Sequence, residues 1–122
     1  MKLITVMKSK LHRAAVTSCE IDYEGSLRVD PELIKRAEML PFEWVHIWNI
    51  TNGQRFETYL IEGAPGSREF CVNGAAARLC QPGDRIIVAT TCTIPIEDGP
   101  DHEPVVVLLD ERNRVVDPVN AG

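Results

Sequence analysis

The chain has 122 residues, of which 44% are hydrophobic and 25% charged, and its formal net charge is -5. This length allows one domain with a hydrophobic core, and the composition is that of a folded soluble protein rather than a disordered one. An acidic chain gains little from phosphate groups, so neither nucleic acid nor an anionic membrane surface is expected as a partner. No apolar run approaches ~20 residues and no secretory signal opens the chain, which predicts a cytoplasmic location.

The cysteines and histidines form no metal-binding pattern. Cys19, Cys71, Cys80 and Cys92 include no C-x-x-C pair. Without a secretory signal, we expect four free thiols packed as small hydrophobic groups. The three histidines are scattered, and none has the spacing of a metal ligand, so we predict no structural zinc.

Strand signals dominate the first half of the chain. Residues 3–17 mix β-branched and polar residues, and an uninterrupted strand would place six side chains on one face: Ile4, Val6, Lys10, His12, Ala14 and Val16. Asn52-Gly53 separates two further strand-like segments, 43–50 and 54–61. This dipeptide predicts a hairpin with a type I′ turn, because both central residues of that turn need positive φ.

The second half has similar signals. Pro82-Gly83 fits the central positions of a type II turn. It leads into residues 85–93, an apolar run typical of a strand buried on both faces. Segments 105–110 and 115–117 predict another hairpin around Asn113, and the tail after position 117 is expected to be mobile.

Two short helices are expected. Asp30 is a suitable N-cap and Pro31 a suitable first helical residue. The following apolar residues recur with helical spacing and would form one buried stripe: Leu33, Ala37 and Leu40. A second helix covers about residues 73–79. Many short strands with two small helices favour a closed or partly closed β-barrel, in a single domain of residues 1–122.

No motif of a common hydrolase, kinase or dinucleotide site occurs, and a Gly-Ser pair by itself usually marks a turn. Five segments nevertheless occur in a fixed order: Lys8-Ser9-Lys10-Leu11-His12-Arg13-Ala14; Tyr23-Glu24-Gly25-Ser26; Trp48-Asn49-Ile50-Thr51-Asn52-Gly53 with Arg55 and Thr58-Tyr59; Asn73-Gly74-Ala75-Ala76-Ala77; and Pro82-Gly83-Asp84. Together they resemble the aspartate 1-decarboxylase family. The resemblance runs from about Lys8 to Asp117, and the shared order makes it specific.

This resemblance implies a mainly β fold, a double-psi β-barrel with two short helices, and a homotetramer with active sites between subunits. It implies a covalent pyruvoyl cofactor, made when the chain cuts itself between Gly25 and Ser26 into residues 1–25 and 26–122. The implied reaction is decarboxylation of L-aspartate to β-alanine and CO2 through an imine, in the route to pantothenate and coenzyme A. Some relatives need an accessory maturation protein, and the sequence leaves this open.

In the implied self-cleavage, the Ser26 hydroxyl attacks the carbonyl of Gly25. Glycine at that position would allow the strained backbone that brings the two groups together. The resemblance makes Thr58 the donor to the developing oxyanion, while the Asn73-Gly74-Ala75 corner holds the precursor loop.

For the substrate, the resemblance gives Arg55 as the anchor of the side-chain carboxylate, Lys10 as added positive charge and Tyr59 as the proton donor. Further residues are implied as substrate contacts or pocket residues: Asn73, Gly74, Ala75, Ala76, Tyr23, His12 and Trp48. Alternation places Arg55 and Tyr59 on one strand face and Thr58 on the other. We therefore expect an interface site at which Arg55 and Tyr59 serve different pyruvoyl groups.

Plainer interpretations remain open for single residues. Arg55 fits a solvated strand position, Tyr59 a barrel rim and Thr58 an ordinary strand residue. One alternative function is a non-catalytic β-barrel binding module, in which Ser26 would stay uncleaved. Another is an enzyme of the same fold that acts on a different acidic substrate such as glutamate. Asp22 stands where relatives often carry His, and residues 97–104 carry no predicted chemistry.

Overall fold

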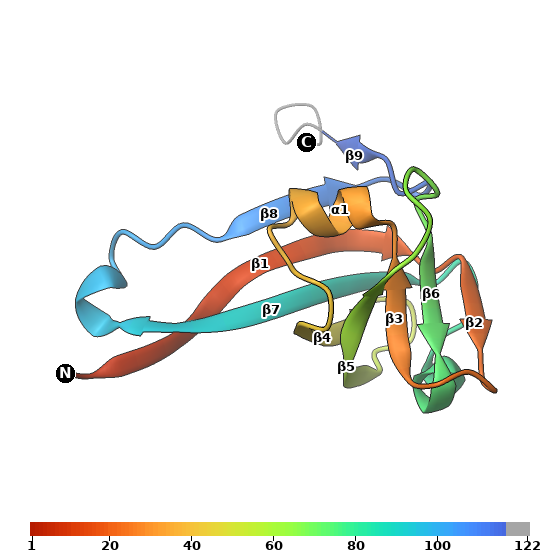
Figure 1. The fold of residues 1–122 in the computed structure, drawn as a ribbon, viewed down its shortest axis with the longest axis horizontal. Coiled ribbons are helices and arrows are strands. Elements are labelled where there is room, and N and C mark those ends of the chain that lie inside the picture. The colour runs from red at the N-terminus through yellow and green to blue at the C-terminus, as the bar shows by residue number, and fades with distance from the viewer. Residues whose placement is uncertain (117–122) are drawn as a thin grey trace.

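A computed structural model describes residues 1–116 of the chain. Within them, strands form one mixed sheet in the order β2-β6-β3-β5-β4-β7-β1-β8-β9 (Figure 1). The strands are β1 (Leu3–Ala15), β2 (Ser18–Glu20), β3 (Ser26–Val29), β4 (Trp44–Asn49), β5 (Arg55–Glu62), β6 (Phe70–Asn73), β7 (Arg85–Pro95), β8 (Val105–Leu109) and β9 (Val115–Val116). The helices are the α-helix α1 (Pro31–Arg36) and the 3₁₀ helices η1 (Gly74–Leu79) and η2 (Ile96–Asp98). The mainly β class and both expected helices are confirmed, and η2 is an addition.

The sheet interleaves segments that are distant in sequence. Strand β3 lies between β5, which runs parallel to it, and β6, which runs antiparallel. Strand β1 likewise pairs antiparallel with β7 and parallel with β8. Parallel neighbours require crossover connections. This mixed, crossed-over order agrees with the expected double-psi β-barrel.

Two irregularities break the face expected along β1. Its register against β7 shifts between Met7 and Ser9 and again between His12 and Ala14. Each shift inserts one extra residue, and the second one, Arg13, has a φ of 67°. Lys10 and His12 are therefore half-buried on one side, whereas Ala14 and Val16 are buried. The prediction of a single shared face is wrong, because a bulge turns the following side chains over.

The β4–β5 hairpin is confirmed, but its turn is not type I′. Gly53 has a φ of 80°, whereas Asn52 is not among the residues with positive φ. The connection is longer than two residues. The Asn49 side chain stabilises it by accepting hydrogen bonds from the N–H groups of Thr51 at 2.9 Å and Asn52 at 3.3 Å. An asparagine cap of this kind favours a wider loop over the two-residue turn.

The Pro82-Gly83 turn is confirmed as type II, with a φ of 93° at Gly83 and a 3.0 Å hydrogen bond from the Asp84 N–H to the Gln81 carbonyl. Strand β7 follows it but is not buried on both faces throughout, since Thr91 and Thr93 are exposed. Beyond Thr90, β7 and the start of β1 run on as a two-stranded arm, on the left of Figure 1. Within residues 1–116, no third strand covers this arm.

Helix α1 begins as expected, with the Asp30 carboxylate accepting from the Glu32 N–H and proline in the first turn. Leu33 and Ala37 are buried, but Leu40 is 68% exposed, so the predicted stripe fails at its last member. The helix ends at Arg36 and the backbone turns left-handed at Glu38, with a φ of 56°. Met39 is therefore the residue that turns inward.

The β8–β9 hairpin is also confirmed, with Asn113 in its loop at a φ of 59°. Position 117 and the predicted mobile tail lie outside the described residues. The core forms between α1 and the inner face of the sheet, and its largest fully buried side chains include Phe70, Leu11, Leu27, Ile47, Leu60 and Ile86. In residues 1–116, no helix has both the length and the apolar character needed to cross a membrane.

Candidate functional site

The first residue of β3 places the Ser26 side chain inside the sheet, where the residue is 1% exposed. Ser26 pairs with Asn73 at the end of β6, and Asn73 Nδ2 donates to Ser26 Oγ at 3.0 Å. Ser26 Oγ is also 3.5 Å from the carbonyl oxygen of Glu24, which is long for a hydroxyl hydrogen bond. Asn73 is thus the main polar partner that fixes the Ser26 hydroxyl.

Gly74, directly after Asn73, makes a close backbone contact with Gly25. Its φ is 71°, and a Cβ at this position would lie 2.6 Å from Gly25 Cα and 2.7 Å from Gly25 N. Gly25 itself has open space around its own Cβ position and is not among the glycines with positive φ. The strain expected at Gly25 is therefore not present as left-handed backbone, and the close approach requires glycine at position 74 instead.

Strand β5 lies beside this corner. Leu27 pairs with Leu60 in parallel, so Gly25 and Thr58 each precede a paired residue by two positions. Thr58 is 7% exposed on the inner face, and Tyr59 is half-buried on the outer face, as alternation predicts. Among residues 1–116, no hydrogen bond joins the Thr58 hydroxyl to Gly25 or Ser26.

A second group of predicted residues lies on the outer face of the sheet. Arg55 pairs with Trp48, Trp48 with Ile87, and Ile87 with His12, which makes one row across β5, β4, β7 and β1. The Arg55 guanidinium carbon is 5.1 Å from the centre of the Trp48 ring. Lys10 precedes His12 by two residues and is half-buried on the same face. The row gathers a cation, an aromatic ring and an imidazole.

Positive charges surround this outer group, which favours an anionic ligand. Burial, and then the charges of Lys10, Arg13 and Arg85, lower the pKa of His12 below its ordinary value of 6.5, so its imidazole is neutral at neutral pH. The Nδ1 atom of His12 is buried and has no hydrogen-bond partner among the described residues. Arg55 is exposed, and among residues 1–116 no hydrogen bond or ion pair engages its planar fork, which can hold a carboxylate bidentately.

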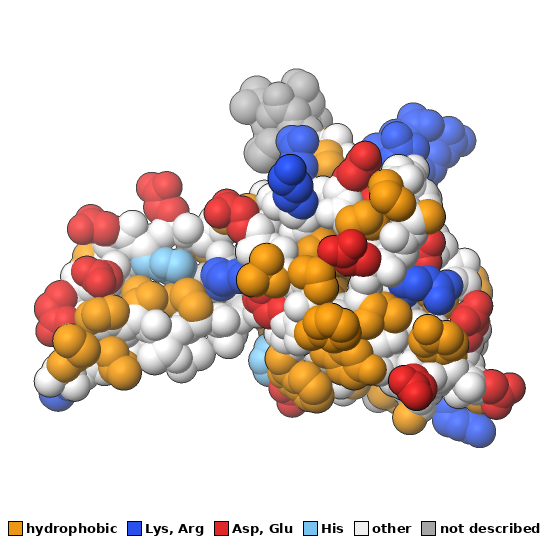
Figure 2. Space-filling view, in the orientation of Figure 1, with side chains coloured by type: hydrophobic (Ala, Val, Ile, Leu, Met, Phe, Trp, Pro, Cys, Tyr) orange, Lys and Arg blue, Asp and Glu red, His pale blue; other side chains and the backbone are white. Residues whose placement is uncertain are grey.

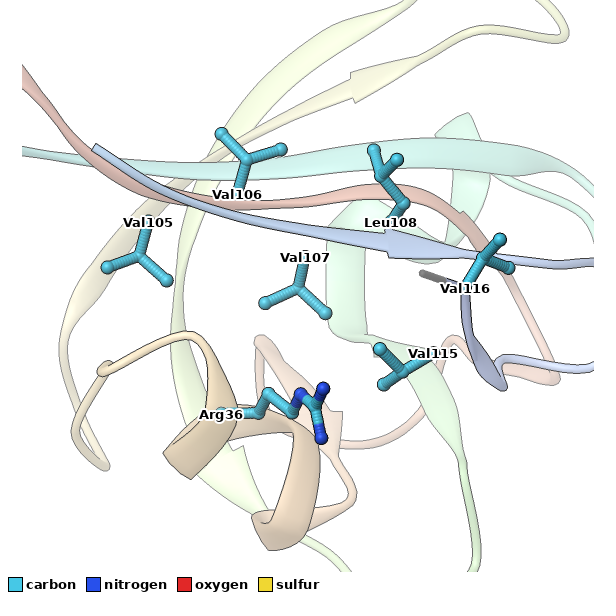
Figure 3. A pocket seen from close by; sticks show the side chains of 7 residues that line it. All are labelled: Arg36, Val105, Val106, Val107, Leu108, Val115 and Val116. Atoms are coloured by element: carbon cyan, nitrogen blue, oxygen red, sulfur yellow. The ribbon is translucent and has the colours of Figure 1, made fainter. Parts of the chain in front are cut away.

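Within one chain, the structure does not unite the two groups. Ser26 is buried inside the sheet, whereas Arg55 is exposed on the outer face of β5. Arg55 and Tyr59 are themselves four residues apart on β5, or ~13 Å along a strand. The pocket in Figure 3 lies between α1 and the β8–β9 hairpin and is lined by valines, Leu108 and Arg36, with none of the predicted site residues. Tyr23 and Ala75 are exposed and Ala76 is half-buried, beside the Ser26 corner rather than the outer group.

The sequence model of the family described as aspartate decarboxylase matches residues 1–116. The chain belongs to this family. The aspartate 1-decarboxylase of Legionella pneumophila (strain Lens) is 54% identical over 110 residues, which is 90% of this chain and 83% of the relative. That of Maricaulis maris (strain MCS10) is 52% identical over 113 residues, or 93% of each chain. That of Rhodopirellula baltica is 45% identical over 119 residues, or 96% of this chain and 76% of the relative.

One residue near the Ser26 corner, Cys71, was not predicted from the sequence to contact the site. Cys71 was expected only to pack, yet its thiol is 3.1 Å from the Asn73 amide oxygen. Residues two positions apart on a strand share a face, so the Cys71–Asn73 spacing was the sequence signal that could have indicated this contact. All four cysteines are free, and burial raises the pKa of Cys80 to about 12, so that thiol is no nucleophile at neutral pH.

Proposed function

We propose that this chain decarboxylates L-aspartate to β-alanine and CO2 with a pyruvoyl group that it makes from Ser26. One observation carries the proposal: in a member of the aspartate decarboxylase family, Asn73 holds the buried Ser26 hydroxyl beside the close Gly25–Gly74 contact. Formed at position 26, the pyruvoyl group would supply an electrophilic ketone for the substrate amine and a sink for the electron pair released with CO2.

Self-cleavage begins when Ser26 Oγ attacks the carbonyl carbon of Gly25. The new C–O bond replaces the peptide C–N bond, and the hydroxyl proton passes to the released amine. Thr58, two residues before the Leu60 that pairs with Leu27, donates to the oxygen on which negative charge develops. Loss of the Ser26 Cα proton and breakage of the Cβ–Oγ bond then release residues 1–25 as a carboxylate. Water replaces the nitrogen of residue 26, which leaves as ammonia.

The remaining residues bind the substrate and handle its proton. Arg55 anchors the side-chain carboxylate through its guanidinium, which the Trp48 ring holds in position, and Lys10 adds positive charge. Tyr59 donates the proton that replaces CO2. Backbone groups of Gly74, Ala75 and Ala76 line the approach to Ser26.

The site is proposed to form between subunits of a homotetramer, a proposal supported by the burial of Ser26 inside the sheet and the exposure of Arg55 on its outer face. Three exposed side chains at the connection from α1 into β4, Leu40 (68%), Phe42 (74%) and Trp44 (56%), support an interface there. Figure 2 shows hydrophobic side chains gathered there, below α1. The Phe42 ring centre is 6.4 Å from that of Tyr59, so the apolar patch adjoins the proposed proton donor.

Turnover of L-aspartate by the matured protein tests the proposed activity. We expect β-alanine and CO2 in equal amounts, no product from Ser26→Ala, and a higher KM for Arg55→Lys, whose ammonium lacks the bidentate fork. Glutamate should react ~10–200-fold less efficiently, because the extra methylene displaces one carboxylate. Cleaved protein that produces no β-alanine would contradict the proposal, and equal use of glutamate would change the substrate.

A further inference from the structure

Cys71 and Asn73 lie two residues apart on β6, so their side chains project from the same side of the strand. Both residues are 0% exposed. The Cys71 thiol donates to Asn73 Oδ1 at 3.1 Å, and Asn73 Nδ2 donates to Ser26 Oγ at 3.0 Å. These two hydrogen bonds form a buried chain that ends at the oxygen proposed to react.

The hydrogen bond from Cys71 bears on the orientation of the Asn73 side-chain amide. A thiol is a weak donor and a weak acceptor, whereas a hydroxyl donates and accepts more strongly, so either group can donate to the Asn73 amide oxygen. Because Cys71 donates to the amide oxygen of Asn73, the amide N–H groups face Ser26. The flipped amide would direct its oxygen at Ser26 Oγ and leave that oxygen without the Asn73 donor.

We propose that Cys71 is a positioning residue for self-cleavage: its S–H holds the Asn73 amide so that Nδ2–H points at Ser26 Oγ. This inference rests on the proposed function, because it needs the Gly25–Ser26 bond to be cut. It gives the Cys71 thiol a role in addition to packing.

The Asn73 donor acts on one step in particular. When the ester between Gly25 and Ser26 is eliminated, the Cβ–Oγ bond breaks and its electron pair stays on Oγ, which leaves as part of the Gly25 carboxylate. The Ser26 Cα proton leaves with its pair forming the new C=C bond. An N–H group aimed at Oγ stabilises the charge that develops there. The preceding attack needs an electron-rich Oγ and gains nothing from this donor, so Cys71 acts on the elimination.

The test compares Cys71→Val, which fills similar space without a donor, with Cys71→Ser, which restores one. Full-length proteins are incubated warm, and fragments 1–25 and 26–122 are followed by intact mass. Brief hydroxylamine treatment at neutral pH at each time measures the ester at position 26. Hydroxylamine also cuts Asn-Gly bonds, so intact mass is used to distinguish the ester products from cuts at Asn52-Gly53 or Asn73-Gly74. We expect Cys71→Val to release fragments about tenfold more slowly, the loss of roughly one neutral hydrogen bond, and to accumulate ester. Cys71→Ser should cleave like the wild type without accumulating ester.

Thermal melting separates positioning from folding, and Cys71→Ala is a second donor-free variant if Cys71→Val is unfolded. If both donor-free variants cleave as fast as the wild type, this inference is overturned and the proposed function stands. A Cys71→Ser variant as slow as Cys71→Val would also overturn it. Wild-type protein that never cleaves would instead remove the proposed function, and this inference with it.

Discussion

Gly74 has the tightest backbone contact at the candidate site. In Gly74→Ala, the left-handed backbone costs ~1–2 kcal/mol, and the new Cβ must also displace Gly25, whose Cα and N would lie within 2.7 Å of it. We expect self-cleavage to slow at least about tenfold, because Gly25 moves away from Ser26 Oγ. Intact mass measured against time reports the cleavage rate.

Gly66→Ala is the matched control for this substitution. Gly66 has a similar φ of 79°, but a Cβ there would meet nothing within 4 Å. It should lose the same conformational stability, measured by thermal melting, and keep the wild-type cleavage rate. Equal slowing in both variants would show that stability alone, and not the Gly25 contact, controls the reaction.

Glu43 is the centre of a partly buried polar network. Its carboxylate accepts from Lys8 at 2.9 Å, from Thr90 at 2.7 Å and from the Leu40 N–H at 3.1 Å. Burial would raise the pKa of Glu43, but these hydrogen bonds outweigh it and hold the pKa below the ordinary value of 4.5. A carboxyl with a lowered folded-state pKa contributes stability above its unfolded-state value and loses it as the pH falls through the folded-state value.

Glu43→Gln should therefore lower the free energy of unfolding by ~1–3 kcal/mol at neutral pH. This difference from the wild type should shrink as the pH falls below about 4.5. Urea unfolding at a series of pH values measures it, with the exposed Glu103→Gln as control. A difference that stays constant with pH would contradict the role of the charge.

At the residue scale, local chemistry was predictable where one side chain acts on its own neighbours. The Asp30 cap and the left-handed Gly83 follow from residue type alone. The exposure of Leu40 could not be predicted from residue type, because it depends on where α1 ends. The constraint assigned to Gly25 belongs to Gly74, since only the fold brings these two backbones together.

At the element scale, Asp30 joins α1 to the loop before β6. Its carboxylate accepts from the N–H groups of Glu32 at 2.9 Å, Gly66 at 3.1 Å and Arg68 at 2.8 Å, and the residue is 1% exposed. Asp30→Ala removes the cap and leaves three partly buried backbone donors without their acceptor, so we expect a loss of ~2–3 kcal/mol. Denaturant unfolding measures this loss.

The control for Asp30 is Glu32→Ala, which removes only an exposed favourable charge from the first turn of α1. We expect ~0.3–1 kcal/mol for that variant. Should Asp30→Ala cost no more than Glu32→Ala, the loop contacts of Asp30 contribute nothing to stability.

Hairpins were the elements that the sequence predicted best, because a turn and its two flanking strands are local. The β4–β5 and β8–β9 pairs both occur near the expected positions. The bulges of β1 were not predictable, since they depend on its register against β7, which follows more than 70 residues later. The parallel partners of β3 and β1 also depend on crossovers that no local pattern encodes.

At the scale of the whole molecule, two inactive variants should restore each other if the site is shared. Ser26→Ala lacks the cofactor precursor but keeps Arg55, and Arg55→Ala keeps Ser26. Co-expressed, they should form mixed assemblies in which roughly a quarter of the sites combine Ser26 from one subunit with Arg55 from another. Aspartate turnover in the mixture measures this recovery. No activity above that of the separate variants would place both residues in one chain's site.

The mass of the purified protein after prolonged warm incubation, beside Ser26→Ala, tests the central claim most directly. The account predicts two fragments, residues 1–25 ending in a free carboxylate and residues 26–122 beginning with a pyruvoyl group. Their summed mass should equal that of the chain plus one water minus one ammonia, and Ser26→Ala should stay whole. Cleavage only after an accessory maturation protein is added would still agree with the account and would identify that partner. A single uncleaved mass under both conditions would contradict it and favour a non-catalytic binding module.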